Sequence, residues 1–413
     1  MKRKLSLILA LLLLASAASC GDAASTDTGD DTTADTTTSA PETDYVDTLV
    51  NDAYKGKTLR ILDANDYVNM HINIPGEEQN GDITNDALYQ RDRMMEEKFG
   101  ITVKYTQVSG AKAGCEQMNQ AVLSGDDAYD YVISCLLGGA LANSATSGTL
   151  ANLVDIEQLS LTEPWWSAHM YNTLRLKDKM YFISGDISTT TYQASTVIYG
   201  NARLLDEYKI DKEALLDQAL AGKWTVDAYL AILKDKDIDV DNDGKLSYQT
   251  DFMGVTNVSS LPNHSFPTNR RTVVLNKDKT NLELNFSDEM TVNLLEKISA
   301  YCVPYTNSEG NDGPINMFKN GRAIFVTHQT ETAINKLRDM KDDYIILPLP
   351  KADESQESYV SGFSGWCDCY VGVPKTADLD FVGTMMEAMA YIGYRDIRPK
   401  AYELVYANKA ARD

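Results

Sequence analysis

The chain has 413 residues and is strongly acidic, with 60 Asp and Glu against 38 Lys and Arg and a formal net charge of −22. Nucleic-acid binding depends on clustered basic side chains, so this charge excludes a nucleic-acid partner and fits a surface that serves solubility. The length beyond the N-terminal segment is sufficient for two packed lobes, each with a core of its own.

The first twenty residues have the parts of an export signal. Residues 2–4 are basic, and residues 5–18 form an apolar core that is short for a membrane-spanning helix. The string AASCG at residues 17–21 resembles the bacterial lipobox, although Leu is usual at the position of Ala17. The resemblance implies cleavage before Cys20 and lipidation of its sulfur. The alternative is ordinary signal cleavage beside an incidental cysteine.

An acidic tether follows the signal. Residues 21–44 are mostly Asp, Thr, Ser, Ala and Gly, with no basic residue. Such a segment buries too little apolar surface to offset its chain entropy, so we assign residues 21–54 to a disordered tether and lead-in. No other apolar run approaches the length of a membrane span. We therefore expect the protein to sit on the extracellular face of the cytoplasmic membrane, at the cell surface or in the periplasm, anchored by its lipid alone.

Five cysteines remain when Cys20 is set aside: Cys115, Cys135, Cys302, Cys367 and Cys369. An odd number with irregular spacing is not typical of a disulfide framework. Cys367 and Cys369 lie two positions apart in a strand-like run, where their side chains share a face but diverge too far for easy bridging. We expect most of the five to be small buried hydrophobic residues.

Strand and helix patterns alternate in the first part of the mature chain. The predicted elements are a strand at Lys57–Leu62, a helix at Asn85–Phe99, a strand at Ile101–Val108, a helix at Gly114–Ser124 and a strand at Tyr129–Ser134. This order predicts an α/β lobe with a largely parallel sheet. Ligands of such sheets lie beyond the carboxyl ends of the strands, which places Ala64–Asn69 and Cys135–Gly139 at one rim.

The stretch Met180–Asn201 has the pattern of a crossing between lobes. Two strand-like runs, Met180–Ile183 and Ala194–Tyr199, flank a turn at Gly185-Asp186 and a patch of Ser and Thr. Trp165 and Trp166 come shortly before it. Because adjacent residues point apart, at most one of them could face a cleft, and we expect them to pack.

The remaining chain continues to mix helices and strands. Predicted helices are Ala202–Tyr208, Lys212–Ala221, Trp224–Lys234 with Thr225 as N-cap, Ser287–Tyr301 with Ser287 as N-cap, Ile315–Asn320, Glu331–Met340, Phe381–Arg395 and Pro399–Ala411. Predicted strands are Thr272–Leu275, Leu282–Phe286, Ala323–Thr327, Tyr344–Leu347 and the glycine-broken run Ser358–Val373.

Several strings, in this order, resemble one known family. They are YDYVIS, PWW, KDKMYFISGDIS, GKWTVDAY, DNDGK, LRDM, IILPLPK and the run FSGW…YVGVPK, spread over residues 129–375. The family is that of the extracellular solute-binding lipoproteins of ABC importers (family 1), which is related to the maltose-type sugar-binding proteins.

The resemblance implies a two-lobed, periplasmic-binding-protein-like α/β fold (type II), in which each lobe has a central sheet flanked by helices. Lobe 1 would comprise residues 55–187 plus 372–413, and lobe 2 residues 188–371. The lobes would be joined by hinge strands at Gly185–Thr196 and Gly362–Val373. The family normally continues past residue 413, so we expect the C-terminal part of lobe 1 to be truncated in this sequence.

The acidic loop at residues 239–251 resembles the start of an EF-hand calcium loop. Asp239, Asp241 and Asp243 supply oxygens at positions one, three and five, a glycine follows, and Lys245 would offer its backbone carbonyl. Thr250 holds position twelve, so Asp251 would close the site after a one-residue insertion. We expect a structural calcium here and no other cofactor; the alternative is a solvated acidic turn.

Candidate ligand-binding residues follow strands or lie in the crossings. Sugars present apolar faces and hydroxyl groups, which suit aromatic side chains together with amide and carboxylate heads. The candidates are Asn65, Asp66, Tyr67, Asp186, Ser188, Tyr192, His328, Trp366 and Asp368. For each aromatic residue the alternative is packing in a core or hinge, and Asp186 could serve only to fix a turn.

No catalytic signature stands out in the sequence. The four histidines form no His-Glu-x-x-His motif, and a Gly-Phe-Ser-Gly string at residues 362–365 is one residue short of a nucleophile elbow. The sequence predicts a non-enzymatic, monomeric receptor that passes a small polar ligand, a sugar or oligosaccharide, to an ABC permease. The alternatives are a surface-anchored glycan hydrolase, or a peptide-binding receptor or sensor of the same fold.

Overall fold

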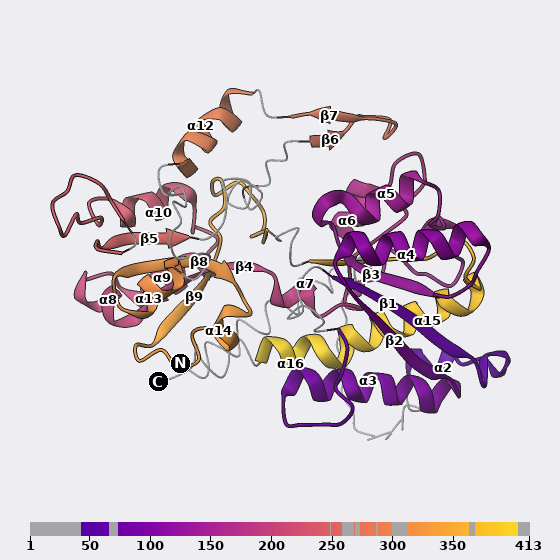
Figure 1. The fold of residues 1–413 in the computed structure, drawn as a ribbon. Helices are drawn as coiled ribbons and strands as arrows, with labels where there is room; N and C mark the ends of the chain where they lie inside the picture. Colours follow the sequence, from indigo (N-terminus) through magenta and orange to yellow (C-terminus); the bar gives the residue numbers. More distant parts are fainter. Residues whose placement is uncertain are drawn as a thin grey trace, which may run out of the picture. The chain divides into compact units, whose positions relative to one another are not determined.

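The structure is a computed structural model that describes residues 43–65, 73–247, 249–257, 268, 273–285, 288–299, 313–362 and 368–403. These residues build two four-stranded sheets and a short two-stranded hairpin. Figure 1 shows the helices packed against the two larger sheets. The two four-stranded sheets share no strand. The mixed α/β fold predicted from the sequence is confirmed.

The first sheet has the strand order β10-β3-β1-β2. Its strands β1 (Thr58–Asn65), β2 (Thr102–Ser109) and β3 (Tyr131–Cys135) pair in parallel, with β1 in the middle. Strand β10 (Cys369–Gly372) runs antiparallel to β3. Strands β1 and β3 are nearly wholly buried, whereas the edge strand β2 is partly exposed along its length, which fits helices covering both faces of the sheet centre.

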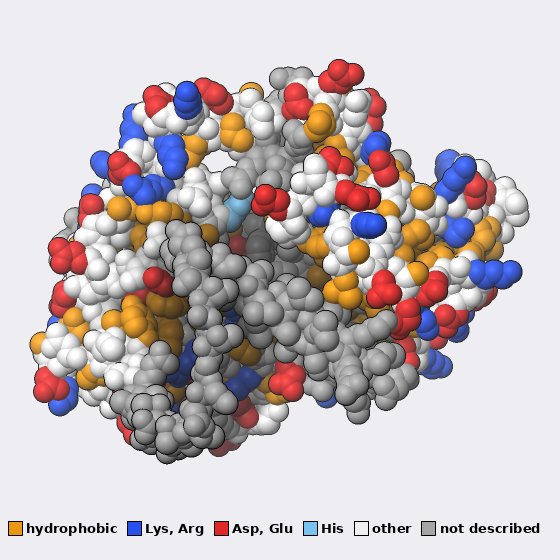
Figure 2. All heavy atoms as spheres, turned by 180° about the vertical axis from the view of Figure 1, so that it is seen from behind, with side chains coloured by type: hydrophobic (Ala, Val, Ile, Leu, Met, Phe, Trp, Pro, Cys, Tyr) orange, Lys and Arg blue, Asp and Glu red, His pale blue; other side chains and the backbone are white. Residues whose placement is uncertain are grey.

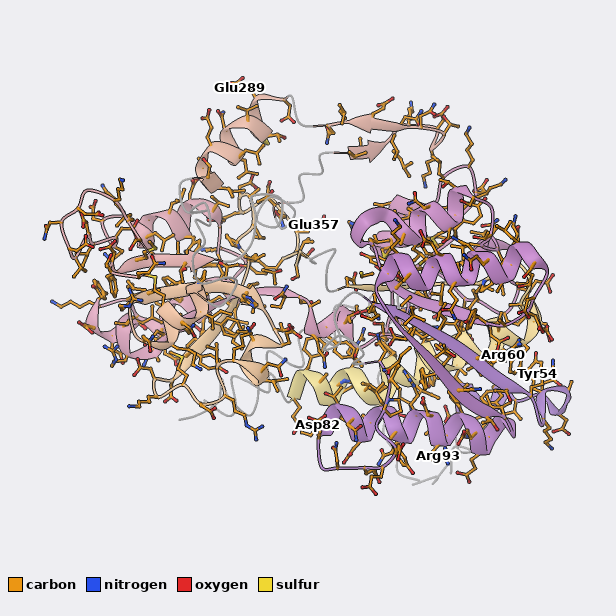
Figure 3. The ribbon with its side chains drawn as sticks, viewed as in Figure 1. Tyr54, Arg60, Asp82, Arg93, Glu289 and Glu357 are labelled. Atoms are coloured by element: carbon orange, nitrogen blue, oxygen red, sulfur yellow. The ribbon has the colours of Figure 1, made fainter. Side chains whose placement is uncertain are left out.

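Two helices connect the parallel strands. Helix α3 (Ile83–Phe99) begins after Asp82, whose carboxylate accepts a hydrogen bond from the Asn85 N–H at 2.8 Å, and it ends at Gly100 with φ 64°. Asp82 marks the start of this helix in Figure 3. Helix α4 (Ala111–Ser124) approaches β1 so closely that a Cβ on Gly114 would lie 2.2 Å from the Cβ of Ala64. Glycine at this position therefore permits the helix–sheet contact.

A buried carboxylate on α15 (Leu379–Ile392) ties several segments to the first core. Glu387 has no exposed surface, and its two oxygens accept four hydrogen bonds of 2.9–3.2 Å. The donors are the indole N–H groups of Trp165 and Trp166, the hydroxyl of Tyr45 and the backbone N–H of Ser160. The packing role predicted for the two tryptophans is confirmed, but both indoles converge on one carboxylate, which their adjacency in sequence did not suggest.

The second sheet has the strand order β5-β8-β4-β9. Strand β8 (Ala323–Gln329) pairs in parallel with β5 (Met253–Asn257) and antiparallel with β4 (Thr196–Asn201). Strand β9 (Tyr344–Pro348) pairs antiparallel with β4 on its other side. A separate core covers this sheet, with Trp224, Tyr229 and Phe325 fully buried in it and the Trp224 indole donating to the Pro348 carbonyl at 2.9 Å.

Helices of the second core follow the sequence closely in some places and not in others. Thr225 caps α10 (Val226–Leu233) as predicted, accepting from the Ala228 N–H at 3.3 Å. Helix α12 (Glu289–Ser299) is capped by Asp288, which accepts from the Thr291 N–H at 3.0 Å, so the prediction of a helix starting after Ser287 is wrong by one residue. The predicted long helix from Glu331 is only one turn, α14 (Thr332–Asn335).

The other described elements are short. They are the helices α2 (Tyr45–Thr48), α5 (Ala140–Thr146), α6 (Ala168–Leu174), α7 (Thr190–Gln193), α8 (Ala202–Glu207), α9 (Lys212–Leu220), α13 (Gly313–Lys319) and α16 (Arg398–Tyr402), the π-helix Gly393–Ile397, the 3-10 turns Asp52–Tyr54, Leu137–Gly139 and Leu153–Asp155, and the hairpin of β6 (Val273–Leu275) and β7 (Leu282–Leu284).

The helices of the described segments include none long and apolar enough to cross a membrane. On the face drawn in Figure 2, acidic and basic side chains are interspersed over the described surface. The leader, Cys20 and the tether up to residue 42 lie outside the described residues. The prediction of disorder up to residue 54 is wrong for its last part, because the short helices Tyr45–Thr48 and Asp52–Tyr54 bury Val46 and Tyr54 in the first core.

Replacing Glu387 by alanine is expected to lower the free energy of unfolding by about 3–5 kcal/mol, because buried donors lose their shared acceptor. Glu387→Gln keeps one acceptor oxygen and should cost less. Urea unfolding measures both, with Glu116→Ala on α4 as the matched control, since Glu116 is exposed and makes an i,i+4 ion pair with Lys112 at 3.8 Å. Equal losses of unfolding free energy in Glu387→Ala and Glu116→Ala would contradict this structural role of Glu387.

Candidate functional site

The carboxyl edge of the first sheet brings together residues from three strands. Strands β1 and β3 end there at Asn65 and Cys135, and the antiparallel β10 begins there with Cys369. Asn65 is fully buried; its amide group donates to the Asp63 carboxylate, and its side-chain oxygen accepts from the Cys369 thiol at 3.3 Å. Strand β1 therefore runs three residues past its predicted end at Leu62. The carboxyl edge, where these three strands meet, is where an open α/β sheet binds ligands.

The chain leaves the first sheet through a buried polar segment. Ile183 exchanges two backbone hydrogen bonds with Val371, at 3.1 and 2.8 Å. Asn73 then holds the following turn, because its side-chain oxygen accepts from the Ser188 hydroxyl at 3.0 Å and from the Thr189 N–H at 2.9 Å. Between the turn and β4 the chain forms the short helix α7, so the predicted second strand begins only at Thr196.

A single hydroxyl joins the outgoing chain to the returning chain. The Thr190 hydroxyl oxygen accepts from the Cys369 N–H at 2.9 Å and lies 3.4 Å from a carboxylate oxygen of Asp368, to which it donates. The Ser184 hydroxyl donates to the same oxygen at 3.4 Å. Asp368 is 3% exposed, and burial raises the pKa of its carboxyl group to about 6, although these hydroxyls and the Cys369 N–H act to lower it.

Asp186 is buried against the C-terminal helices. It is 3% exposed, and the Arg398 guanidinium of α16 donates to its carboxylate at 3.1 Å. The π-helix passes so close that a Cβ on Gly393 would lie 1.8 Å from the Asp186 carbonyl oxygen. Burial raises the pKa of the Asp186 carboxyl group to about 7, and the charge of Arg398 opposes this shift.

Tyr192 packs between α3 and the C-terminal helices. It is 4% exposed and belongs to a small apolar cluster with Ala87, Leu88, Ile397 and Ala401. Its ring centroid lies 6.4 Å from that of Tyr402. These contacts favour the packing alternative for Tyr192, while contact with a ligand stays a prediction.

The second sheet presents a comparable edge. Strand β8 ends there with His328 and Gln329, and the register pairs Thr196 at the start of β4 with Gln329. The Thr196 N–H donates to the Gly362 carbonyl at 3.1 Å, so the returning chain lies beside the outgoing chain here as well. His328 is partly exposed, and its Nδ1 contacts the Thr332 hydroxyl.

Solved structures with this arrangement are known. UspC of M. tuberculosis matches with a TM-score of 0.53 at 13% identity, over 85% of this chain and 84% of that one. The maltose-binding protein MalE of Listeria monocytogenes matches with a TM-score of 0.52 at 14% identity, over 84% and 78%. The fold is that of the two-lobed solute-binding proteins of ABC transporters.

A third structure with the solute-binding-protein fold agrees with the first two. The galacto-N-biose- and lacto-N-biose I-binding protein of an ABC transporter from Bifidobacterium longum matches with a TM-score of 0.51 at 14% identity, over 84% of this chain and 77% of that one. No protein-family model and no curated protein sequence matches this chain. At these identities the comparisons establish the fold.

Six of the nine predicted ligand residues lie in the described part of this solute-binding-protein fold. Asp66, Tyr67 and Trp366 lie outside the described residues. Asn65, Asp186, Ser188, Tyr192 and Asp368 are all buried. Because their hydrogen bonds and packing contacts go to other protein groups, a ligand would reach them only after the crossings rearrange, and His328 is the candidate with exposed surface.

Sequence reasoning missed the residues that hold the first crossing in place. Asn73 and Thr190 lie among polar residues that no motif marks. Arg91 is 3% exposed; it pairs with Asp92 at 2.9 Å and donates to the Ile187 carbonyl at 3.4 Å. A basic residue in the middle of an amphipathic helix is a weak signal, because most such residues are solvated.

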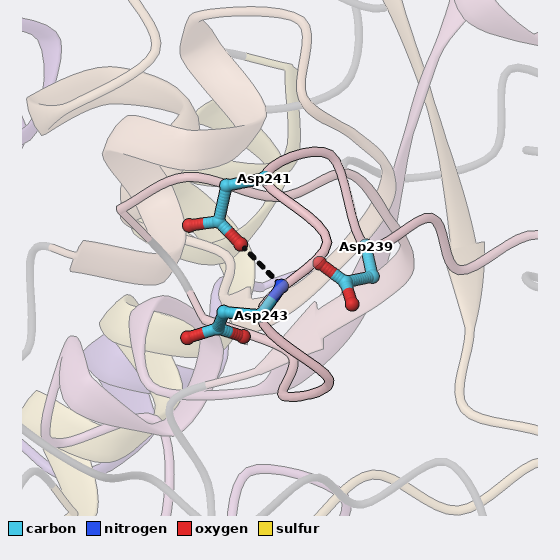
Figure 4. Close-up of side chains that lie close together, drawn as sticks. All are labelled: Asp239, Asp241 and Asp243. Atoms are coloured by element: carbon cyan, nitrogen blue, oxygen red, sulfur yellow. Dashed lines mark hydrogen bonds between the residues drawn. The ribbon is translucent and has the colours of Figure 1, made fainter.

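The acidic loop gathers three of the five predicted calcium residues. Carboxylate oxygens of Asp239, Asp241 and Asp243 lie within 4.8 Å of one another (Figure 4). Each carboxylate also accepts a backbone N–H of the loop at 2.8–3.2 Å, from Gly244, Asp243 and Lys245 in that order. One buried oxygen of Asp239 has no hydrogen-bond partner among the described residues. Hard carboxylate oxygens that converge in this way fit the ligand preference of calcium.

Asp251 closes the base of the loop through the backbone. Its carboxylate accepts from the Val240 N–H at 2.8 Å and from the Ser247 N–H at 2.7 Å. Burial acts to raise the pKa of the Asp251 carboxyl group, but these backbone donors outweigh it and leave the pKa lowered. Asp251 lies outside the three-carboxylate cluster, so its role as a closing ligand stays a prediction.

Replacing Asp186 by asparagine is expected to flatten the dependence of stability on pH. The folded-state pKa of about 7 lies above the unfolded value of about 3.9, so between these values the folded protein holds a proton that the unfolded chain has released. The stability from this group is fully present below about pH 4 and is lost as pH rises through 7.

Urea unfolding between about pH 4 and pH 8 should show a loss on the order of 2–4 kcal/mol in the parent protein and less in Asp186→Asn. Asp368 contributes the same trend in both proteins. Asp235→Asn, at an exposed position with φ 57°, is the control that should leave the profile unchanged. Identical profiles of unfolding free energy against pH for the parent protein and Asp186→Asn would contradict this expectation.

Calcium at about 5 mM is expected to raise the melting temperature by a few degrees, as for a weak extracellular calcium site. Asp241→Asn and Asp243→Asn should reduce the shift, whereas Asp235→Asn should keep it. Magnesium serves as the ion control, because it demands a tighter octahedral geometry. The prediction fails if millimolar calcium leaves the melting curve of the parent protein unchanged.

Proposed function

We propose that the protein is an extracellular solute-binding protein that captures a carbohydrate and delivers it to the permease of an ABC transporter. The observation that carries the proposal is the architecture: two sheets with separate cores, whose carboxyl edges are connected by an outgoing and a returning chain. Because each sheet packs in its own core, bending at the two crossings would change the separation of the edges without repacking either core.

The ligand class rests on the structures that share this fold. MalE of Listeria monocytogenes was solved with maltose, and the Bifidobacterium longum protein with lacto-N-biose. The names of these proteins describe binding and no reaction, which supports capture without bond chemistry in this chain. Closure would be stabilised by contacts that a sugar makes with both edges at once.

A thermal-shift screen of mono- and oligosaccharides, with peptides and polyols in the same plate, tests the ligand class. At a concentration one hundred times its dissociation constant, the preferred sugar should add about 2.7 kcal/mol of stability. Stabilisation by peptides alone would overturn the carbohydrate proposal and leave a peptide receptor of the same fold.

Once a sugar is found, His328→Ala is expected to weaken its binding about tenfold, the value of one lost hydrogen bond. Titration calorimetry measures the affinity, and His169→Ala on α6 is the matched control. Unchanged affinity in His328→Ala would remove His328 from the ligand site.

We further propose that export and lipidation at Cys20 anchor the protein to the membrane. The support is the leader sequence and its lipobox-like end, together with the acidic tether that follows. Detergent phase partition of the protein from cells tests this: the parent chain should enter the detergent phase, and Cys20→Ser should move to the aqueous phase. A parent chain found wholly in the aqueous phase would refute the anchor.

A further inference from the structure

Two cysteines stand opposite each other on neighbouring strands of the first sheet. Cys369, the first residue of β10, is the register partner of Cys135, the last residue of β3, and the two strands are antiparallel. Both side chains are buried, with exposed fractions of 0% and 1%, and the structure holds both as thiols. Nothing in the sequence spacing of these residues pointed to the pair.

The hydrogen bonds of β10 decide which kind of antiparallel pair this is. Residues two apart on a strand direct their backbone groups to the same side. Val371 exchanges hydrogen bonds with Ile183, on the side away from β3, and the Cys369 N–H likewise turns away from β3 to donate to Thr190 at 2.9 Å. Cys369 and Cys135 therefore form a non-hydrogen-bonded pair.

Non-hydrogen-bonded pairs bring side chains close enough for a disulfide. Their Cα atoms lie about 4.5 Å apart, within the range of about 4.4–6.8 Å that a disulfide spans. The side-chain direction agrees: the Cys369 sulfur reaches the Asn65 side-chain oxygen on β1 at 3.3 Å. Strand β3 lies between β10 and β1, so the Cys369 side chain leans across β3 where Cys135 stands.

The third described cysteine does not compete for this pairing. Cys115 on α4 lies 3.7 Å from the Ser134 hydroxyl. Ser134 and Cys135 are adjacent on β3, so their side chains point to opposite faces of the sheet. Cys115 is therefore on the face away from Cys135.

We propose that Cys135 and Cys369 form a cross-strand disulfide that links the returning chain covalently to the first sheet. Two thiols each lose a proton and together two electrons, and one S–S bond forms. The electrons and protons pass to a small-molecule disulfide, such as oxidised glutathione, which becomes two thiols. The persistence of such a bond outside the cytoplasm rests on the export proposed above, whereas the geometry does not.

The disulfide would close a long loop at the crossing. The chain between residues 135 and 369 contains every strand of the second sheet. The bond would fix β10 to β3 beside the Thr190 contact, so that the returning chain keeps its register while the crossings bend. Burial raises the pKa of the Cys369 thiol, with the Asp63 and Asp368 carboxylates adding to the effect, so the native thiol is a poor nucleophile and the bond forms most readily during folding.

The test is oxidative refolding of the purified chain. The reduced, unfolded protein is refolded in a glutathione redox buffer, remaining thiols are alkylated, and peptides are mapped by mass spectrometry without reduction. A peptide joining Cys135 to Cys369 is expected in most molecules. The oxidised protein should melt about 5 °C above the same sample treated with reductant.

Variants separate this pair from the other cysteines. Cys115→Ala should keep both the cross-link and the melting shift, and Cys369→Ala should lose both. A triple variant with Cys115, Cys302 and Cys367 each changed to alanine should still close the bond. Recovery of Cys135 and Cys369 as alkylated thiols, or a cross-link from either to another cysteine, would overturn the proposal. None of these measurements uses a ligand or a membrane, so they stand apart from the tests of the proposed function.

Discussion

The contact between Thr190 and the start of β10 is the constraint on which this architecture depends. The chain leaves the first sheet after Ile183 and returns to it at Cys369, and one hydroxyl bonds to both the N–H of Cys369 and the carboxylate of Asp368. Without it, the buried N–H at the start of β10 would lose its Thr190 acceptor, and losing a buried hydrogen bond costs stability. The two crossings therefore behave as one connection.

The region around this contact contains buried polar and charged side chains, unlike an apolar hydrophobic core. Asp186 forms an ion pair with Arg398, and Arg91 forms one with Asp92. The Asn73 side chain holds the turn at Ser188 by a hydrogen bond. Buried ion pairs add little net stability, because the loss of hydration offsets the attraction. They do, however, specify one geometry over others, which suits a connection whose position must be reproducible. The expected pH dependence arises from the same burial of carboxyl groups.

Glu387 on α15 serves the first lobe's core in a related way. Its carboxylate is enclosed by donors from Tyr45, from Ser160 and from two tryptophans, so segments far apart in sequence share one acceptor. A hydrophobic residue at this position would leave the indole and hydroxyl groups without partners. The Cys135–Cys369 pair would add a covalent connection to the same lobe, at the edge where the ligand is expected to bind.

The sequence alone determined the alternation of strands and helices, the helix ends at Thr225 and Gly100, and the α/β class, because these follow from local periodicity and capping. It also located the acidic loop, since its ligands are neighbours in the chain. Only the tertiary structure decided that Asn65, Ser188 and Tyr192 are enclosed by protein, that Trp165 and Trp166 share Glu387, and that Cys135 opposes Cys369. These facts depend on pairing between residues more than a hundred positions apart, and no local pattern carries the register of such a pairing.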